Sequence, residues 1–408
     1  MSETVFTYAA PALKLGSGAS AEVGHDLASY GARRVLLVTD PGVAATGHPA
    51  RIAEQVAARG LEVTTYDGVH VEPTDESLRA AVAFARDAGP FDAILAVGGG
   101  SSIDTAKAVN LLTTNPGELM DYVNAPIGRA RAPREPLLPL VAVPTTTGTG
   151  AESTTICVLD VQSLRVKTGI SHPALRPTLA VVDPALSVTQ PATVTAAAGM
   201  DILCHALESW TARWYADFAA KRPEERVPYC GANPIADLWA ERAMTLLAGV
   251  FRDAVRDGTD LAAREQMAMA ATFAGLGFGN AGVHIPHANA YPIAGRSEVL
   301  IPHGVAVSLT APEAFRFTFD AAPERHVNAA RLLDPSVEPG PDALPTVLTA
   351  LMRDIGIPNG LSAVGYAEAD VADLVAGALQ QQRLLATAPR SPTDEDLASV
   401  FRRSMEHW

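Results

Sequence analysis

The sequence predicts two domains, a parallel α/β domain over residues 1–190 and an all-helical domain over residues 191–408. Between about residues 33 and 185, short apolar runs alternate with segments of helical period, which implies βαβ units in a parallel sheet. Later segments are long, alanine-rich and helical in period. A chain of 408 residues also exceeds one typical hydrophobic core, which favours two domains.

In the first domain, strands and helices alternate along the chain. Gly60 follows one helical segment, as expected of a residue that ends a helix. The expected strands are residues 34–40 and 61–68, a strand that runs into glycines within 92–101, and a strand that runs into a threonine and glycine loop within 137–150. The expected helices are residues 49–60, 75–89 and 102–114.

The second domain contains helical patterns only. The change falls near residues 181–193, after which no alternation of strand and helix is found. The expected helices are residues 191–215, 234–258, 261–280, 342–356 and 367–387.

Composition and charge exclude several classes of protein. Apolar residues make up 48% of the chain and charged residues 19%, which is a globular composition. The net charge is −14, and lysine and arginine form no cluster. Nucleic acid is therefore not an expected partner, because phosphate contacts require clustered cations.

The cysteines and the N-terminal segment bear on location. Three cysteines without CxxC spacing favour a reducing compartment and no disulfides. The N-terminal segment lacks the pattern of a signal peptide, and no apolar run reaches the roughly 20 residues of a membrane span. We therefore expect a cytoplasmic protein with no membrane partner.

Asp40 ends the first expected strand. An acid at a strand end can accept hydrogen bonds from the ribose hydroxyls of an adenosine, and it repels a 2′-phosphate. This interpretation predicts NAD rather than NADP. The alternative is that Asp40 only begins a turn, because the sequence DPG is typical of turns.

Two segments rich in glycine and hydroxyl groups follow later strands. They are GGGSSIDTAK at 98–107 and PTTTGTGAE at 144–152. Glycines let the backbone approach a pyrophosphate, a helix N-terminus offers N–H groups, and threonines add uncharged donors, so both segments favour a dinucleotide. Two alternatives stay open: Ser101 or Ser102 can be a simple helix cap, and Asp104 with Lys107 can be an exposed helix pair.

Asp201 and His205 lie four residues apart on an expected helix, so both side chains project from one face. A carboxylate and an imidazole at this spacing are good ligands for a divalent transition metal. Glu208 lies one turn further and can orient a ligand through a hydrogen bond. The alternative is an acid that stabilises the helix dipole beside a half-buried histidine.

His284 and His287 lie in the segment NAGVHIPHANAYPIAG with a proline between them. That proline suits the first turn of a helix and biases the residue before it towards extended structure. We therefore expect His287 in a first helical turn, with Tyr291 on the same face, and His284 before the helix. His303 lies between a proline and a glycine, in a loop position that can aim the imidazole inward.

The candidate ligands form a set of three nitrogens and one oxygen: Asp201, His205, His287 and His303. This set fits Fe²⁺ or Zn²⁺ and leaves positions open for a substrate oxygen. Together with a dinucleotide site it predicts metal-assisted hydride transfer between an alcohol and NAD. The proton can leave through water, the cofactor ribose, Tyr291 or His284. A tyrosine of ordinary pKa, near 10, is a poor base, so His284 or the ribose is favoured, and a purely structural His284 is the alternative.

Five motifs, in this order, resemble those of the iron-containing alcohol dehydrogenases, and the resemblance runs from about residue 5 to 400. They are GGGSSIDTAK, PTTTGTGAE, GMDILCHALES, NAGVHIPHANAYPIAG and IPHG. The resemblance implies a Rossmann-like nucleotide domain followed by a helical metal-binding domain, a plan shared with dehydroquinate synthase. It also implies Fe²⁺ and NAD as cofactors, and we expect a homo-oligomer such as a dimer.

The resemblance further implies roles for individual residues. The family's metal ligands fall on Asp201, His205, His287 and His303, and its NAD-selecting acid falls on Asp40. Its dinucleotide loops fall on Gly99, Gly100, Ser101, Thr145, Thr146 and Thr149, with Ser102 as a further candidate. Lys167, in RVKTGI, resembles the lysine that reaches the cofactor. Many members have a catalytic histidine where this chain has Tyr291.

Within the family, the motifs VHxxHxxxYPI, CHALES and GANPIADLWA most resemble the hydroxyacid-oxoacid transhydrogenase branch. Members of that branch oxidise 4-hydroxybutyrate while they reduce 2-oxoglutarate. The segment AGRSEVLIPHG, residues 294–304, is shorter than expected of that branch. The alternative function is NAD(H)-dependent reduction of a short-chain aldehyde such as lactaldehyde or a phosphonate aldehyde.

Two other classes of function are disfavoured. A lyase of the dehydroquinate synthase type would gather basic residues around the metal for a phosphate, whereas those between residues 199 and 304 are scattered. A binding protein without catalysis would not need the complete set of metal ligands. We therefore expect a small-molecule alcohol, aldehyde or hydroxy acid as the substrate.

Overall fold

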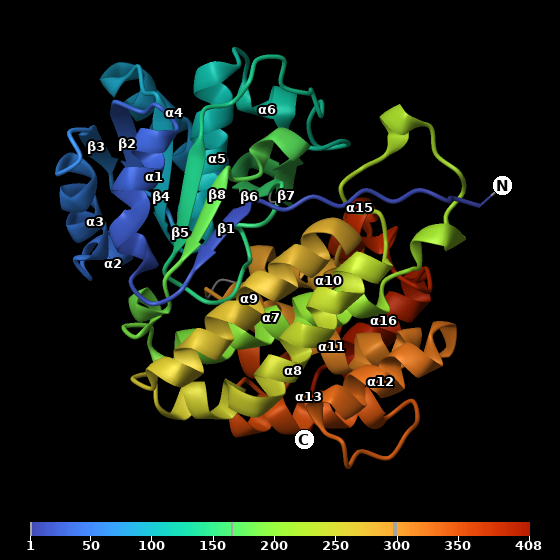
Figure 1. Cartoon of the computed structure of the whole chain (residues 1–408). Coiled ribbons are helices and arrows are strands. Elements are labelled where there is room, and N and C mark those ends of the chain that lie inside the picture. The colour runs from blue at the N-terminus through green and yellow to red at the C-terminus, as the bar shows by residue number, and fades with distance from the viewer. Residues whose placement is uncertain (1, 165, 297–299) are drawn as a thin grey trace. The chain divides into compact units, whose positions relative to one another are not determined.

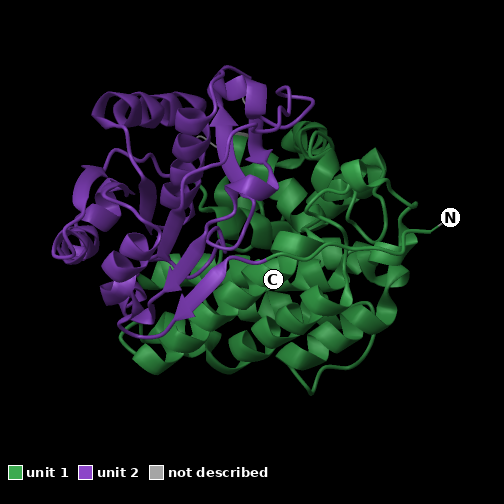
Figure 2. Cartoon of the chain, turned by 45° about the horizontal axis from the view of Figure 1, so that its top comes forward, with its two compact units in different colours: residues 1–9, 191–408 green, residues 10–190 purple. Residues whose placement is uncertain are grey.

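The fold is known from a computed structural model that describes residues 2–164, 166–296 and 300–408 (Figure 1). The chain divides into two compact units (Figure 2). The α/β unit is Ala10–Gln190, and the helical unit is Met1–Ala9 with Pro191–Trp408.

The α/β unit is built on a sheet of six parallel strands in the order β1-β8-β5-β4-β2-β3. In that order the strands are Ala12–Leu15, Leu179–Val182, Leu140–Pro144, Ala93–Gly98, Arg34–Val38 and Glu62–Tyr66. The main helices are α1 (Val23–Ser29), α3 (His48–Ala57), α4 (Asp75–Ala88) and α5 (Gly100–Thr114). The expected alternation between residues 34 and 150 is confirmed, with small shifts at the element ends.

Alternate residues of the central strands pack on opposite faces of this sheet. Leu36 and Ile94 join the apolar cluster that contains α4 and α5. Leu37 and Leu95 join the cluster that contains α1 and α3. Burial on both faces explains why these strands are apolar throughout, and it confirms the Rossmann-like class.

Two parts of the α/β unit were not expected from the sequence. Strand β1 is only four residues long and lies at the sheet edge, where Leu13 and Leu15 stay exposed, so no burial pattern marks it. Strands β6 (Ile156–Val161) and β7 (Val166–Ser171) form an antiparallel pair outside the main sheet. The four residues of β1 give too little periodicity to be recognised.

The helical unit is held together by one large apolar cluster. Its helices are α7 (Ala192–Thr211), α8 (Pro234–Arg256), α9 (Leu261–Ala281), α10 (Ile285–Arg296), α11 (His303–Thr318), α12 (Pro323–Leu333), α13 (Ala343–Asp354), α14 (Val371–Leu379), α15 (Gln382–Leu385) and α16 (Asp394–Arg403). Over the described part of the chain, none of the helices has the length and apolar character needed to cross a membrane.

The expectation of one helix at 367–387 was wrong. The chain leaves helical geometry at Gln381, which separates α14 from α15. Leu384 and Leu385 of α15 both join the apolar cluster.

The first nine residues belong to the helical unit, although the sequence analysis assigned residues 1–190 to one domain. The Glu3 N–H donates to the Phe218 carbonyl at 2.9 Å. Ala9 exchanges two hydrogen bonds with the Asn280 side chain, at 2.9 and 3.1 Å. These contacts join residues far apart in sequence, which local sequence patterns do not report.

Candidate metal centre and dinucleotide loops

Helix α7 carries the first half of the candidate metal centre. It is buried on nearly all sides, yet it places Asp201, His205 and Glu208 on one face at spacings of four and three. A polar stripe inside a buried helix needs partners, because unpaired polar groups are costly in an apolar interior. His205 stacks on the Phe278 ring of α9, with ring centroids 3.8 Å apart.

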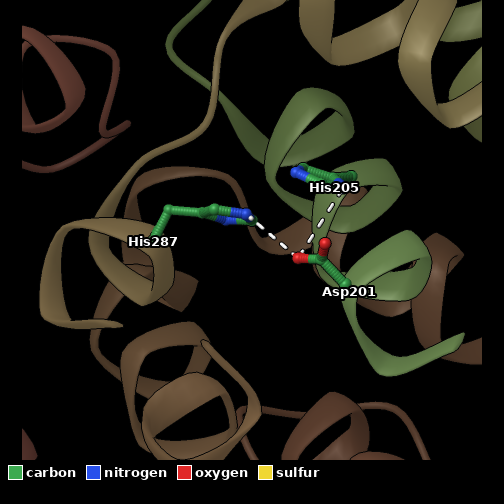
Figure 3. Close-up of side chains that lie close together, drawn as sticks. All are labelled: Asp201, His205 and His287. Carbon is green, nitrogen blue, oxygen red and sulfur yellow. Dashed lines mark ion pairs between the residues drawn. The ribbon is translucent and has the colours of Figure 1, made fainter. Parts of the chain in front are cut away.

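The other two candidate ligands come from the N-terminal ends of α10 and α11. His287 is the third residue of α10, as expected, and its Nε2 lies 3.4 Å from Asp201 Oδ1 (Figure 3). His303 is the first residue of α11, not a loop residue as the sequence suggested, and its Nε2 lies 3.8 Å from the same oxygen. Pro302 occupies the N-cap position of that helix, so this proline marks a helix start and not the loop that the sequence suggested.

Gly304 allows His303 to approach α7. A Cβ at this position would lie 1.9 Å from the Ala197 carbonyl oxygen and 3.0 Å from Asp201 Cβ. Any other residue would therefore push the start of α11 away from α7. The glycine of the motif IPHG thus has a packing role that brings His303 towards Asp201.

Three of the four candidate ligands present buried atoms that lack hydrogen-bond partners among the described residues. These atoms are Asp201 Oδ1, His205 Nδ1 and His287 Nε2. The ligand atoms of the same three residues lie within 4.8 Å of one another (Figure 3). Buried polar atoms almost always have a hydrogen-bond partner, so three such atoms close together without one fit a bound cation.

Glu208 orients His287 through the ring nitrogen opposite the one that faces Asp201. Its carboxylate accepts a hydrogen bond from the His284 N–H at 2.7 Å and one from the His287 N–H at 3.2 Å. It also pairs with His287 Nδ1. This bond leaves Nε2 of His287 directed at Asp201, the arrangement in which a carboxylate supports a metal-binding histidine.

The charges around the centre suit metal binding. Burial acts to raise the pKa of Asp201, but the neighbouring histidines outweigh it and hold this pKa well below its usual range. Burial lowers the pKa of His205 to about 3. Burial also acts to lower the pKa of His287, but the carboxylates of Glu208 and Asp201 raise it to about 9. An ionised Asp201 and a neutral His205 are in the protonation states that bind a metal. His287 must lose a proton before its Nε2 can bind a metal.

His284 is fully buried and lies next to Thr211 and Phe315. The Thr211 hydroxyl donates to the Leu207 carbonyl at 2.7 Å, so it accepts from His284 Nε2 at 2.9 Å. Burial lowers the pKa of His284 to about 4. These contacts favour the structural role that the sequence analysis left open.

Tyr291, the other candidate for the proton relay, lies on α10. It is buried and belongs to the apolar cluster of the helical unit. Residues 297–299, in the segment that is shorter than expected, lie outside the described residues.

The three expected dinucleotide loops follow neighbouring strands of the sheet. Asp40 comes after β2, Gly99 and Gly100 after β4, and Thr145 after β5. The carboxyl ends of parallel strands meet at one edge of a sheet, where nucleotides bind in this class of fold. Gly99 begins α5 without a side-chain cap, so its first N–H groups are presented at the loop.

The glycine and threonine loops pack directly on each other. A Cβ on Gly99 would lie 2.9 Å from Thr146 Oγ1, and a Cβ on Gly100 would lie 2.8 Å from Thr149 Cγ2. Here the glycines make room for threonines, in addition to the approach of a pyrophosphate that the sequence suggested. The Thr145 hydroxyl is buried and has no partner among the described residues.

Lys167 lies on β7 and is nearly buried between two carboxylates. Its ammonium pairs with Glu72 and, at 3.3 Å, with Asp160. The Glu72 backbone N–H donates a hydrogen bond to the Ser101 hydroxyl at 3.1 Å. The sequence analysis missed Glu72, although an acid in the loop after β3 lies at the same edge of the sheet as Asp40.

Asp104 and Lys107 are buried, so their interpretation as an exposed helix pair was wrong. The Lys107 ammonium donates to Asp104 at 3.2 Å, to the Thr154 hydroxyl at 3.0 Å and to the Ile156 carbonyl at 2.7 Å. The pair therefore fastens α5 to the chain that follows the threonine loop. Spacing along a helix does not reveal whether a pair is covered by another element.

Sequence comparison gives two family matches that together cover most of the chain. The profile described as "Iron-containing alcohol dehydrogenase" matches residues 10–184. The profile described as "Fe-containing alcohol dehydrogenase family, C-terminal" matches residues 224–405.

Mitochondrial hydroxyacid-oxoacid transhydrogenases resemble the chain over nearly its full length. The protein of Bos taurus is 43% identical over 420 residues, which cover 98% of this chain and 90% of its own. The protein of Homo sapiens is 42% identical with the same coverage.

Solved structures share the fold. A 1,3-propanediol oxidoreductase superposes with a TM-score of 0.88 at 32% identity, covering 98% of this chain and 100% of its own. A sulfoacetaldehyde reductase from Bifidobacterium kashiwanohense, solved with NAD⁺, gives a TM-score of 0.84 at 27% identity, covering 98% and 99%.

The cytoplasmic location expected from the sequence is wrong. The transhydrogenases that match nearly the whole chain are named as mitochondrial proteins. Cytoplasmic and mitochondrial proteins can both lack a secretory signal pattern and a membrane span, so these two features do not distinguish them.

Proposed function

The chain belongs to the iron-containing alcohol dehydrogenase family, as an oxidoreductase that acts on CH–OH groups, and from this we propose a hydroxyacid-oxoacid transhydrogenase. The proposed reaction moves a hydride from 4-hydroxybutyrate to 2-oxoglutarate by way of bound NAD. The identity of 43% to the transhydrogenase of Bos taurus, across 98% of this chain, supports this substrate pair. We also propose a mitochondrial location, after the names of these relatives.

The observation that best supports a metal-dependent reaction is that buried ligand atoms of Asp201, His205 and His287 lie close together without hydrogen-bond partners among the described residues. We propose that these residues and His303 hold Fe²⁺, with Zn²⁺ as the alternative that metal analysis tests. A divalent metal held there supplies a Lewis acid that polarises the substrate oxygen. Phe278 covers one face of His205 and keeps water from that side.

His303 marks the open side of the proposed centre. Its side chain is 25% exposed, whereas those of Asp201, His205 and His287 are at most 5% exposed. A substrate and water therefore reach the centre at His303. We propose that the substrate proton leaves to water on this side, because the Thr211 hydroxyl already engages His284 and Tyr291 is buried.

We propose that NAD binds the loops at the carboxyl edge of the sheet and accepts the hydride at its nicotinamide. The proposed contacts are Asp40, Gly99, Gly100, Ser101, Thr145, Thr146, Thr149 and Lys167, whereas Ser102 lies buried behind Asp40. The uncapped N-terminus of α5 supports a pyrophosphate position next to Gly100. The sulfoacetaldehyde reductase solved with NAD⁺ supports the same cofactor for this chain.

A second candidate is an NAD(H)-dependent aldehyde reductase without an oxoacid partner. The structural similarity to a sulfoacetaldehyde reductase and to a 1,3-propanediol oxidoreductase favours this alternative. Both reactions use the same centre, so they differ in whether NADH leaves the enzyme between the two half-reactions.

A substrate panel separates the two candidates. The purified protein is loaded with Fe²⁺ and given 4-hydroxybutyrate or short aldehydes, with and without added NAD and with and without 2-oxoglutarate. Transhydrogenation predicts turnover of 4-hydroxybutyrate that depends on 2-oxoglutarate and releases no net NADH. Rapid oxidation of NADH by aldehydes alone, without turnover of 4-hydroxybutyrate, would support the aldehyde reductase and overturn the transhydrogenase.

A further inference from the structure

Both oxygens of the Asp40 carboxylate already accept a hydrogen bond from the protein. Oδ1 accepts from the Val43 N–H at 2.9 Å, which caps the short helix α2 (Pro41–Ala44). Oδ2 accepts from the Ser102 hydroxyl at 3.0 Å. One donor from each side fixes the plane of the carboxylate, which otherwise rotates freely about its last side-chain bond.

Ser102 is a buried residue of α5, so its hydroxyl does not lie at the protein surface. It reaches Asp40 because Gly98, at the end of β4, has no side chain. A Cβ on Gly98 would lie 2.3 Å from Ser102 Oγ and 3.4 Å from Asp40 Oδ2. The first glycine of GGGSS therefore makes room for the bond between Ser102 and Asp40.

We propose that Ser102 is a positioning residue that sets the preference for NAD over NADP through Asp40. This inference rests on the proposed function, in which Asp40 binds the adenosine ribose. The sequence suggested that Ser102 contacts the cofactor directly. We infer instead that Ser102 acts indirectly, by holding Asp40.

The proposed effect follows from the hydrogen-bonding capacity of a carboxylate. Each oxygen has two acceptor sites, so one remains on each after Val43 and Ser102 have bound. Held in one plane, these remaining sites can meet the two neighbouring ribose hydroxyls together. NADP carries a phosphate in place of one hydroxyl, so it gains nothing from this alignment and is repelled by the charge.

The test measures binding of NADH and NADPH to the full chain by nucleotide fluorescence, which requires no substrate. For Ser102→Ala we expect NADH affinity to fall about tenfold, the contribution of one hydrogen bond to a charged group, while NADPH affinity changes less than twofold. Ser102→Cys keeps the size and a weak donor, so it should lie between Ser102→Ala and the native protein.

The matched control is Thr105→Val. Thr105 lies on the same helix with a buried hydroxyl that has no hydrogen-bond partner in the described part of the chain. Its loss should leave both affinities within twofold, and melting temperatures report whether each variant folds. In an Asp40→Gly background, Ser102→Ala should cause no further loss, because its effect passes through Asp40.

Two outcomes separate failure of this inference from failure of the proposed function. If the native protein binds NADPH as tightly as NADH, the NAD assignment itself fails. If it prefers NADH and folded Ser102→Ala keeps that preference in full, the positioning role is overturned. A further loss from Ser102→Ala in the Asp40→Gly background would also overturn it.

Discussion

The candidate metal centre and the dinucleotide loops differ in how their charged groups are paired. In the helical unit, Asp201, His205 and His287 are buried, and their ligand atoms have no hydrogen-bond partner among the described residues. In the α/β unit, Asp40 and Lys167 are already paired with protein groups. We therefore expect the first site to need a cation, whereas the charged groups of the second are paired before a nucleotide binds.

This difference predicts unequal costs of losing each ligand. A buried polar atom without a partner costs about 1–3 kcal/mol, and the metal centre has three such atoms among Asp201, His205 and His287. We therefore expect removal of the metal to lower the melting temperature of the protein clearly, and removal of NAD to lower it much less. The predictions below test this contrast, starting with the largest effect.

Replacing a metal ligand should abolish activity. For Asp201→Ala and His287→Ala we expect loss of bound metal and a fall in kcat of at least about 1,000-fold, because the Lewis acid is gone. NADH binding should stay within about twofold, since the loops are formed separately. Metal analysis and NADH titration of the same samples check both parts. Full activity in a metal-free preparation contradicts the metal centre.

Removing the carboxylate that orients His287 should have a smaller effect. Glu208→Gln loses the charge paired with His287 Nδ1, and such changes typically lower metal affinity or activity about 10–100-fold. A titration with Fe²⁺ under anaerobic conditions measures the affinity. Glu241→Gln, at an exposed position on α8, is the control and should leave the Fe²⁺ affinity unchanged. Equal metal affinity in the two variants would show that Glu208 does not orient the ligand.

A methyl group at Gly304 should displace His303 from the centre. Gly304→Ala brings a Cβ against the Ala197 carbonyl and should destabilise the protein by about 1–3 kcal/mol. Metal affinity should fall with it. Gly249→Ala, in α8, meets no atom within 4 Å and should instead stabilise by roughly 0.5–1 kcal/mol. Denaturant unfolding of both variants measures this. Similar stabilities would contradict the close approach of α11 to α7.

The smallest effect is expected at the nucleotide loops. Asp40→Gly removes the acid that repels a 2′-phosphate, so the preference for NADH over NADPH should fall about tenfold, with metal content unchanged. Titration with both nucleotides, beside metal analysis, checks this. An unchanged preference counts against the ribose role, and a loss of metal counts against the independence of the two sites.

The sequence predicted those features that depend on local spacing. The alternation of strands and helices up to residue 150, the pair Asp201 and His205, and the place of His287 in a first helical turn all follow from residues close in sequence. A resemblance between motifs supplied the family. These features can be predicted without knowing which helices and strands contact each other.

The features that the sequence did not predict depend on contacts between distant segments. Burial of Lys107 comes from Thr154 and Ile156, and the partner of Asp40 is Ser102, 62 residues away. Glu72 was missed, because its partner Lys167 lies on an unexpected strand. Only the fold brings these residues together.

One isotope experiment tests the central claim, transfer of a hydride from a hydroxy acid to an oxoacid at a metal centre. The Fe²⁺-loaded protein is given 4-hydroxybutyrate with deuterium at C4, together with 2-oxoglutarate, and the product is examined by mass spectrometry. We predict 2-hydroxyglutarate that carries deuterium at C2, with no accumulation of free NADH, and no labelled product from Asp201→Ala. Consumption of 4-hydroxybutyrate without label in 2-hydroxyglutarate, or equal transfer by Asp201→Ala, would contradict the claim.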